Sequence, residues 1–137
     1  MKRSMLTGVL LLLAATCPAQ ELKKGNLVGT HLLSVKLQPG VTQEQYARAY
    51  SEKVAPAIAK MTGWRVYPVK RIRGEKADGL AVIMVIASEA ERDKYFSADG
   101  TPNDAGKAVL ATMQSAQDEL SRLGTITADT YTDWLVE

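Results

Sequence analysis

The chain has 137 residues, with 17 Lys and Arg, 15 Asp and Glu, one histidine and one cysteine. This length fits a single domain that buries its own hydrophobic core, and the sequence shows no internal repeat or linker. A nearly neutral chain lacks the basic excess that binding to nucleic acid or to an anionic membrane requires, and one cysteine excludes an intrachain disulfide.

The first 19 residues have the pattern of a secretory signal peptide. A basic start precedes an apolar stretch over residues 5–15, which is too short to span a bilayer. Cys17-Pro18-Ala19 fits the small-x-small motif of a signal peptidase site, so we expect cleavage after Ala19 and a periplasmic or secreted protein. The mature domain, residues 20–137, would then have balanced charge and no thiol. The alternative is a lipoprotein anchored through Cys17.

Residues 27–37 alternate in the way that predicts a strand. The other face of this strand is also apolar near its middle, so we expect both of its sides to be covered. Pro39-Gly40 ends the strand, because proline cannot donate to a ladder and glycine tolerates the turn. One face of the strand carries Leu27, Gly29, His31, Leu33, Val35 and Leu37.

A helix is predicted to begin at Thr42, where Gln45 completes a capping box. Thr62-Gly63 marks its end. Its apolar stripe, at helical spacing, consists of Tyr46, Tyr50, Val54, Ile58 and Met61.

Two strands, 64–72 and 79–87, follow as an antiparallel hairpin joined by a charged turn. Pro68 predicts that the first of them is an edge strand or contains a bulge, because proline cannot complete a ladder on both sides. The second is continuously apolar from residue 80 onward, which suits a central strand.

The last third of the chain predicts more helix and one more strand. Ser88 with Glu91 predicts the start of a short helix that ends near Phe96. A polar loop leads to a third helix over 105–123, and residues 125–136 are rich in Thr, Tyr and Trp, as strands are.

The resulting order, βαββ(α)αβ, is that of a ferredoxin-like α+β fold, in which a four-stranded antiparallel sheet has its helices on one face. The other face of such a sheet is here too apolar to remain in water. Two copies placed sheet to sheet would bury it, so we expect a homodimer with a barrel between the subunits.

Residues 31–41, His-Leu-Leu-Ser-Val-Lys-Leu-Gln-Pro-Gly-Val, resemble the opening of the dimeric α/β-barrel stress-response family. The order of elements is similar to that of the family over nearly the whole mature chain. Related barrels include antibiotic-biosynthesis-type monooxygenases and plant polyketide cyclases. The resemblance implies a small hydrophobic cavity in each barrel, with the strand face of His31, Leu33 and Val35 directed into it.

The sequence departs from the family at a place that matters for catalysis. Cyclases of the family carry a His-Pro-x-His stretch after the short second helix, where it can supply a general base. Residues 95–102 of this chain read Tyr-Phe-Ser-Ala-Asp-Gly-Thr-Pro and contain no histidine. A His-dependent acid–base mechanism therefore lacks one of its two members.

His31 is the candidate catalytic residue. Histidine gives or takes a proton near neutral pH, but it is also common as a partly buried residue bonded to a backbone carbonyl. A lone histidine offers too few ligands for zinc, so we expect neither a metal nor a cofactor. The tyrosines of the first helix also fit a packed stripe, and the tryptophans also fit a dimer core. The candidate ligand-binding residues are His31, Leu33, Val35, Tyr46, Tyr50, Trp64, Tyr131 and Trp134.

Three classes of function remain open. The first is an exported module that holds a small hydrophobic or aromatic molecule in its barrel. The second is a monooxygenase- or cyclase-like enzyme that uses His31. The third is a structural or stress-associated dimer with a filled core, which the volume of the cavity separates from the other two.

Overall fold

The computed structural model describes residues 21–73 and 79–137. The predicted signal peptide, residues 1–19, and most of the predicted hairpin turn lie outside the described residues. The described elements are, in chain order, β1 (Leu27–Leu37), α1 (Gln43–Ala49), the π-helical segment η1 (Tyr50–Val54), α2 (Ala55–Ile58), β2 (Trp64–Lys70), β3 (Leu80–Ile86), α3 (Glu89–Asp93), α4 (Asp104–Thr112), α5 (Gln114–Ser121) and β4 (Gly124–Leu135).

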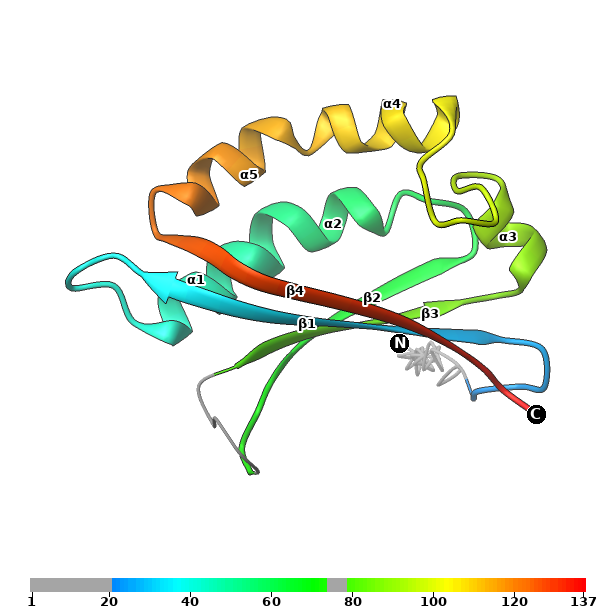
Figure 1. Ribbon diagram of the computed structural model, residues 1–137, viewed down its shortest axis with the longest axis horizontal. Helices are drawn as coiled ribbons and strands as arrows, with labels where there is room; N and C mark the ends of the chain where they lie inside the picture. The colour runs from blue at the N-terminus through cyan, green and yellow to red at the C-terminus, as the bar shows by residue number, and fades with distance from the viewer. Residues whose placement is uncertain (1–20, 74–78) are drawn as a thin grey trace, which may run out of the picture.

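The four strands form one antiparallel sheet in the order β2-β3-β1-β4 (Figure 1). Leu27 of β1 lies opposite Ile86 of β3 on one side and Leu135 of β4 on the other. β2 and β3 pair as the predicted hairpin, with Trp64 also opposite Ile86. The helices are layered on one face of this sheet (Figure 1). The topology confirms the predicted ferredoxin-like α+β fold.

The strands lie close to their predicted positions. β1 has the predicted bounds, and the other three strands differ from the prediction by one or two residues at an end. β2, which contains Pro68, is an edge strand, and β3 is central, as expected. Val82 and Ile86 of β3 are fully buried beneath the helices. The edge position of β2 therefore follows from the backbone donor that Pro68 lacks. The central position of β3 follows from its apolar side chains.

The predicted first helix is interrupted by a π turn. Thr42 and Gln45 form the capping box. In a regular α-helix, the ring of Pro56 would collide with the carbonyl four residues earlier. The N–H of Ala55 instead bonds to the carbonyl of Tyr50, five residues back, which is the π pattern. The stripe still points inward, because Tyr46, Tyr50, Val54 and Met61 are all buried.

The predicted third helix is in fact two helices, α4 and α5, joined at Met113. The N–H of Met113 bonds to the carbonyl of Leu110, three residues back, which tightens the chain at the junction. No proline or glycine marks this junction in the sequence, so the helical periodicity continues across it. Met113 and Leu120 are buried against the sheet. Gly124, expected only to stop the helix, also opens β4.

The face of the sheet that turns away from the helices is here called the open face. By alternation it carries Val28, Leu32, Tyr67, Ile83, Val85 and Trp134. Leu32 and Tyr67 are each 45% exposed, so the expectation that β1 is covered on both sides is wrong for a single chain. Among the described residues, no helix combines the length and the apolar character that crossing a membrane would require.

Candidate functional site

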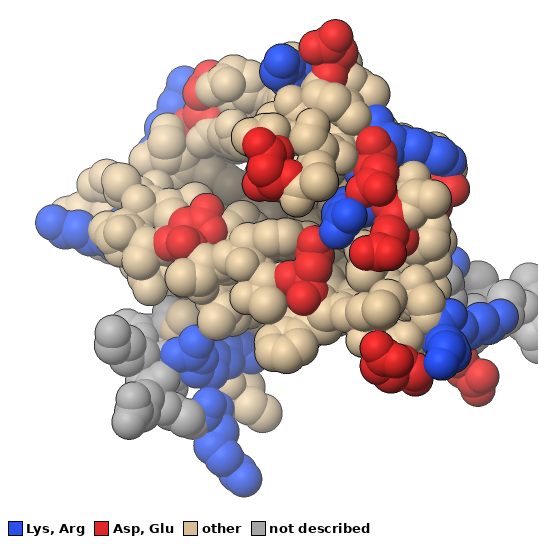
Figure 2. All heavy atoms as spheres, turned by 45° about the vertical axis from the view of Figure 1, so that its right-hand side comes forward, with Lys and Arg blue, Asp and Glu red and all other residues tan. Residues whose placement is uncertain are grey.

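A cavity of about 700 Å³ lies between the sheet and the helices. Its floor consists of helix-facing side chains of the sheet, and side chains from all the helical segments, α1 to α5 and η1, complete its wall. Figure 2 shows the molecule hollowed between these two layers, with acidic side chains on the rim of the hollow. Small-molecule sites have volumes of about 300 to 1,000 Å³, so this cavity is large enough for a ligand.

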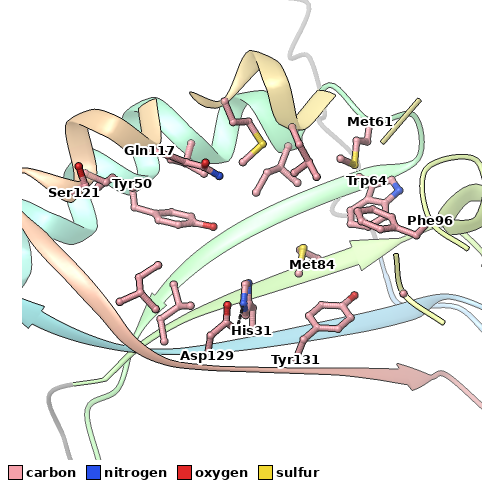
Figure 3. A pocket seen from close by; sticks show the side chains of 18 of the residues that line it. His31, Tyr50, Met61, Trp64, Met84, Phe96, Gln117, Ser121, Asp129 and Tyr131 are labelled. Atoms are coloured by element: carbon pink, nitrogen blue, oxygen red, sulfur yellow. Dashed lines mark hydrogen bonds and ion pairs between the residues drawn. The ribbon is translucent and has the colours of Figure 1, made fainter. Parts of the chain in front are cut away.

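Most of the cavity wall is apolar or aromatic. The rings of Trp64 and Phe96 contact each other at one end, with their centroids 5.7 Å apart and their planes tilted by 36° (Figure 3). Thioether side chains add polarisable surface that adapts to a ligand. The apolar part of the wall is formed by Leu33, Val54, Ile58, Met61, Met84, Leu110, Met113, Leu120 and Ile126.

His31 of β1 and Asp129 of β4 form a hydrogen-bonded pair on the cavity floor (Figure 3). Asp129 is opposite Leu33 in the ladder, so it is one diagonal step from His31 on the same face of the sheet. The Asp129 carboxylate bonds to Nε2 of the ring. Nδ1 has no hydrogen-bond partner within the part of the chain that the structure describes, so it is the nitrogen left for a bound molecule.

Tyr131 lies beside this pair on β4. Its ring meets the His31 ring edge to face, with centroids 5.8 Å apart. The Tyr131 hydroxyl donates a hydrogen bond to Oδ1 of Asp133 at 2.6 Å. Gly29 makes room for this ring, because a Cβ at that position would lie 2.6 Å from the hydroxyl oxygen. Burial, followed by the hydrogen bond to Asp133, raises the pKa of Tyr131.

Arg92 reaches the cavity wall from α3. Its Nη2 bonds to Oδ1 of Asp93 at 2.8 Å, and its Nη1 lies 3.6 Å from Oδ2 of Asp133. Two carboxylates thus surround one guanidinium. The positive charge of Arg92 is neutralised before any ligand arrives.

Tyr50 projects from η1 into the cavity, and its ring points toward the His31–Asp129 pair (Figure 3). The residue is only 6% exposed. Burial raises the pKa of Tyr50 to about 12, with smaller contributions from Tyr46 and from the charge of Asp129. No hydrogen-bond partner for this hydroxyl occurs in residues 21–73 or 79–137. The site therefore contains a neutral, unpaired hydroxyl opposite an imidazole.

Six of the eight predicted ligand-binding residues line the cavity, namely His31, Leu33, Tyr46, Tyr50, Trp64 and Tyr131. Val35 does not; it packs against the hydrophobic core. Trp134 does not either, because it is opposite Val28 and lies on the open face, 59% exposed. Residues 131 and 134 are an odd number of positions apart in a regular stretch of strand, so they cannot share a face.

Sequence reasoning missed the charged residues of the site: Arg92, Asp129 and Asp133. Asp129, Tyr131 and Asp133 are spaced two apart, so strand periodicity alone could have placed both carboxylates beside Tyr131. Arg92 comes from a separate short helix, and no local pattern indicates its position. Within the described ranges, no group of three His, Cys, Asp or Glu side chains could hold a metal ion.

No family model and no curated protein matches the chain. Among solved structures, the chain is similar to SnoaB, a cofactor-independent oxygenase from Streptomyces nogalater, at 13% identity over 82% of this chain and 94% of that one, with a TM-score of 0.48. It is also similar to a dimeric ferredoxin-like protein of unknown function from Bacteroides fragilis, at 13% identity over 80% and 96% of the two chains, with a TM-score of 0.49. These similarities concern the fold alone and transfer no activity.

Tyr50→Phe is expected to reduce the loss of stability at alkaline pH. Below pH 10.0, the ordinary value, both the folded and the unfolded chain keep the Tyr50 proton, so its contribution to stability is fully present. That contribution is lost as the pH rises through the folded pKa of about 12. The difference between these two pKa values corresponds to about 2 to 3 kcal/mol of the free energy of unfolding.

Urea denaturation at several pH values up to about 12, followed by circular dichroism, measures this effect. Tyr50→Phe should lose less free energy of unfolding over this interval than the wild type does. Equal losses of free energy of unfolding in Tyr50→Phe and in the wild type would contradict the assignment.

Proposed function

We propose that the chain binds a small, flat, largely hydrophobic molecule in the cavity between its sheet and its helices. The observation that carries this proposal is the cavity itself, about 700 Å³ in volume and walled by apolar and aromatic side chains. Protein interiors are close-packed and contain few voids larger than a water molecule. A hollow of this size therefore supports binding over a structural dimer with a filled core.

The His31–Asp129 pair favours a second candidate function, catalysis of proton transfer on the bound molecule. An imidazole that donates one N–H to a carboxylate can take a proton at its other nitrogen, because the carboxylate stabilises the imidazolium. Nδ1 of His31 would remove a proton from a carbon next to a carbonyl, and the neutral Tyr50 hydroxyl would donate a hydrogen bond to the enolate oxygen. The sequence has no second histidine to act with His31, and Asp129 takes the place of that partner.

A homodimer that buries the open face forms part of the proposal. Leu32, Tyr67 and Trp134 are respectively 45%, 45% and 59% exposed there. Isolated exposed apolar side chains are ordinary, but several on one sheet face form a contiguous patch. A second copy supplies the same apolar surface in a two-fold arrangement, since the patch is then buried against itself.

Export is also proposed. It rests on the pattern of residues 1–19, which are not among the described residues. Lipidation of Cys17 is the alternative, and it would tether the same domain to a membrane.

Gln117→Trp is expected to weaken ligand binding at least tenfold. Gln117 is an exposed residue of α5 that points into the cavity (Figure 3), so an indole there fills space that the ligand needs. The probe is 1-naphthylmethanol, a neutral flat molecule, titrated by calorimetry. Gln114→Trp, on the same helix but away from the cavity, is the matched control and should bind as wild type does. Binding that survives Gln117→Trp would place the ligand elsewhere.

The catalytic candidate predicts deuterium exchange at the acidic carbon of 2-tetralone in D₂O, measured by mass spectrometry. Wild-type protein should accelerate the exchange at least tenfold over buffer, since a positioned base contributes about 10² to 10⁴. His31→Ala should return the rate to that of buffer, and Gln114→Ala should leave it unchanged. If His31→Ala exchanges as fast as wild type, the chain acts only as a binding protein.

Leu32→Lys is expected to convert the dimer to a monomer, because the substitution places two like charges in the centre of the apolar contact. Light scattering at micromolar concentration gives the mass directly. Ser115→Lys, on the outer surface of α5, is the control and should remain dimeric. A wild-type chain that is a stable monomer at this concentration would overturn the proposal.

A further inference from the structure

The charges on the cavity wall are unevenly balanced. Arg92 is the single Lys or Arg among the described residues that line the cavity, and Asp93 and Asp133 already neutralise it. Asp129 has only His31 as a partner within the described chain. The Asp129 carboxylate therefore has no Lys or Arg partner among the described residues.

Two oxygen atoms of the cavity wall have no hydrogen-bond partner among the described residues and can accept a hydrogen bond, whereas Trp64 Nε1, at the other end of the cavity, is an unpaired donor. One oxygen of Asp129 bonds to His31, and the described residues offer no partner for the other. The Tyr50 hydroxyl is likewise unpaired in the described part of the chain, although the residue is 94% buried, and it projects into the cavity on the helix side of the His31–Asp129 pair (Figure 3). An ammonium group carries three donors and no acceptor, so it matches a carboxylate and a hydroxyl oxygen.

The hydrophobic wall is also suited to a cation. Electron-rich ring faces attract positive charge within about 6 Å. Tyr50 and Tyr131 contribute rings to the end of the cavity that contains Asp129.

We propose that the ligand of this cavity is a hydrophobic amine bound as its ammonium ion, with the nitrogen between Asp129 and the Tyr50 hydroxyl. Its hydrocarbon part lies toward Trp64 and Phe96, at the other end of the cavity (Figure 3). This inference rests on the proposed binding function and does not depend on catalysis. It names the charge class of the ligand, which neither the fold nor the size of the cavity decides.

Three probes of nearly equal shape test the inference: 1-naphthylmethylamine, 1-naphthylmethanol and 1-naphthoate. Calorimetric titration is carried out on the protein at about pH 8, where the amine is protonated. We expect the amine to bind about tenfold more tightly than the alcohol, and the carboxylate to bind more weakly than both.

Asp129→Asn is the decisive variant, because it keeps the size of the side chain and removes its charge. It should abolish the tenfold preference for the amine and leave the affinity for the alcohol within a factor of two. Asp118→Asn, an exposed acid of α5 outside the cavity wall, is the control for net charge and should keep the preference. Circular dichroism verifies that each variant is folded.

The outcomes separate the two proposals. If the alcohol binds and the amine has no advantage, or if Asp129→Asn keeps the preference, the charge class is wrong while the binding function stands. If none of the three probes binds, the binding function fails and this inference fails with it. A preference that is lost in Asp129→Asn and kept in Asp118→Asn supports both.

Discussion

The alternation of side chains along β1 and β4 is the constraint on which the site depends. Every second residue of β1 faces the helices, which places His31 and Leu33 on the cavity floor. A β-bulge changes the register of β4, since Ser34 is opposite Ala128 and Val35 is opposite Ile126. The extra residue in β4 is what allows Ile126 and Asp129, three positions apart, to line the same cavity.

Irregularities in the helix layer coincide with the cavity. Tyr50 begins the π turn that Pro56 imposes, and Met113 lies at the junction of α4 and α5; both residues line the cavity. An uninterrupted helix would rotate these side chains away from their present positions. π turns inside helices are frequently found at functional sites, and here the turn presents a buried hydroxyl to the imidazole across the cavity.

The two faces of the sheet differ in chemistry because the helices lie over one of them and not over the other. The helix-facing side contains His31, Asp129 and Asp133, which line the cavity. The open face contains apolar and aromatic residues such as Leu32 and Trp134. Trp134 is three positions after Tyr131 in β4, so it lies on the opposite face of the sheet. Its Nε1 donates a hydrogen bond to Thr30 Oγ1 at 3.2 Å, on the side away from the cavity.

The local pattern of the sequence determined the elements and their order. Alternation gave the bounds of β1, the Thr42–Gln45 capping box gave the start of α1, and Pro68 gave the edge strand. These features depend on neighbours a few residues apart, so a single chain segment contains all of the information. Strand alternation and helical spacing together selected eight candidate ligand-binding residues, of which six line the cavity.

Only the tertiary structure decided the chemistry of the site. His31 and Asp129 are 98 residues apart, and their contact depends on the register between β1 and β4, which no local pattern specifies. The bulge, the π turn and the arrival of Arg92 from α3 likewise result from packing between distant segments. The sequence therefore determined that His31 and Leu33 share one face of the strand, whereas the fold decided that this face lines the cavity and that a carboxylate and a neutral tyrosine lie there with His31.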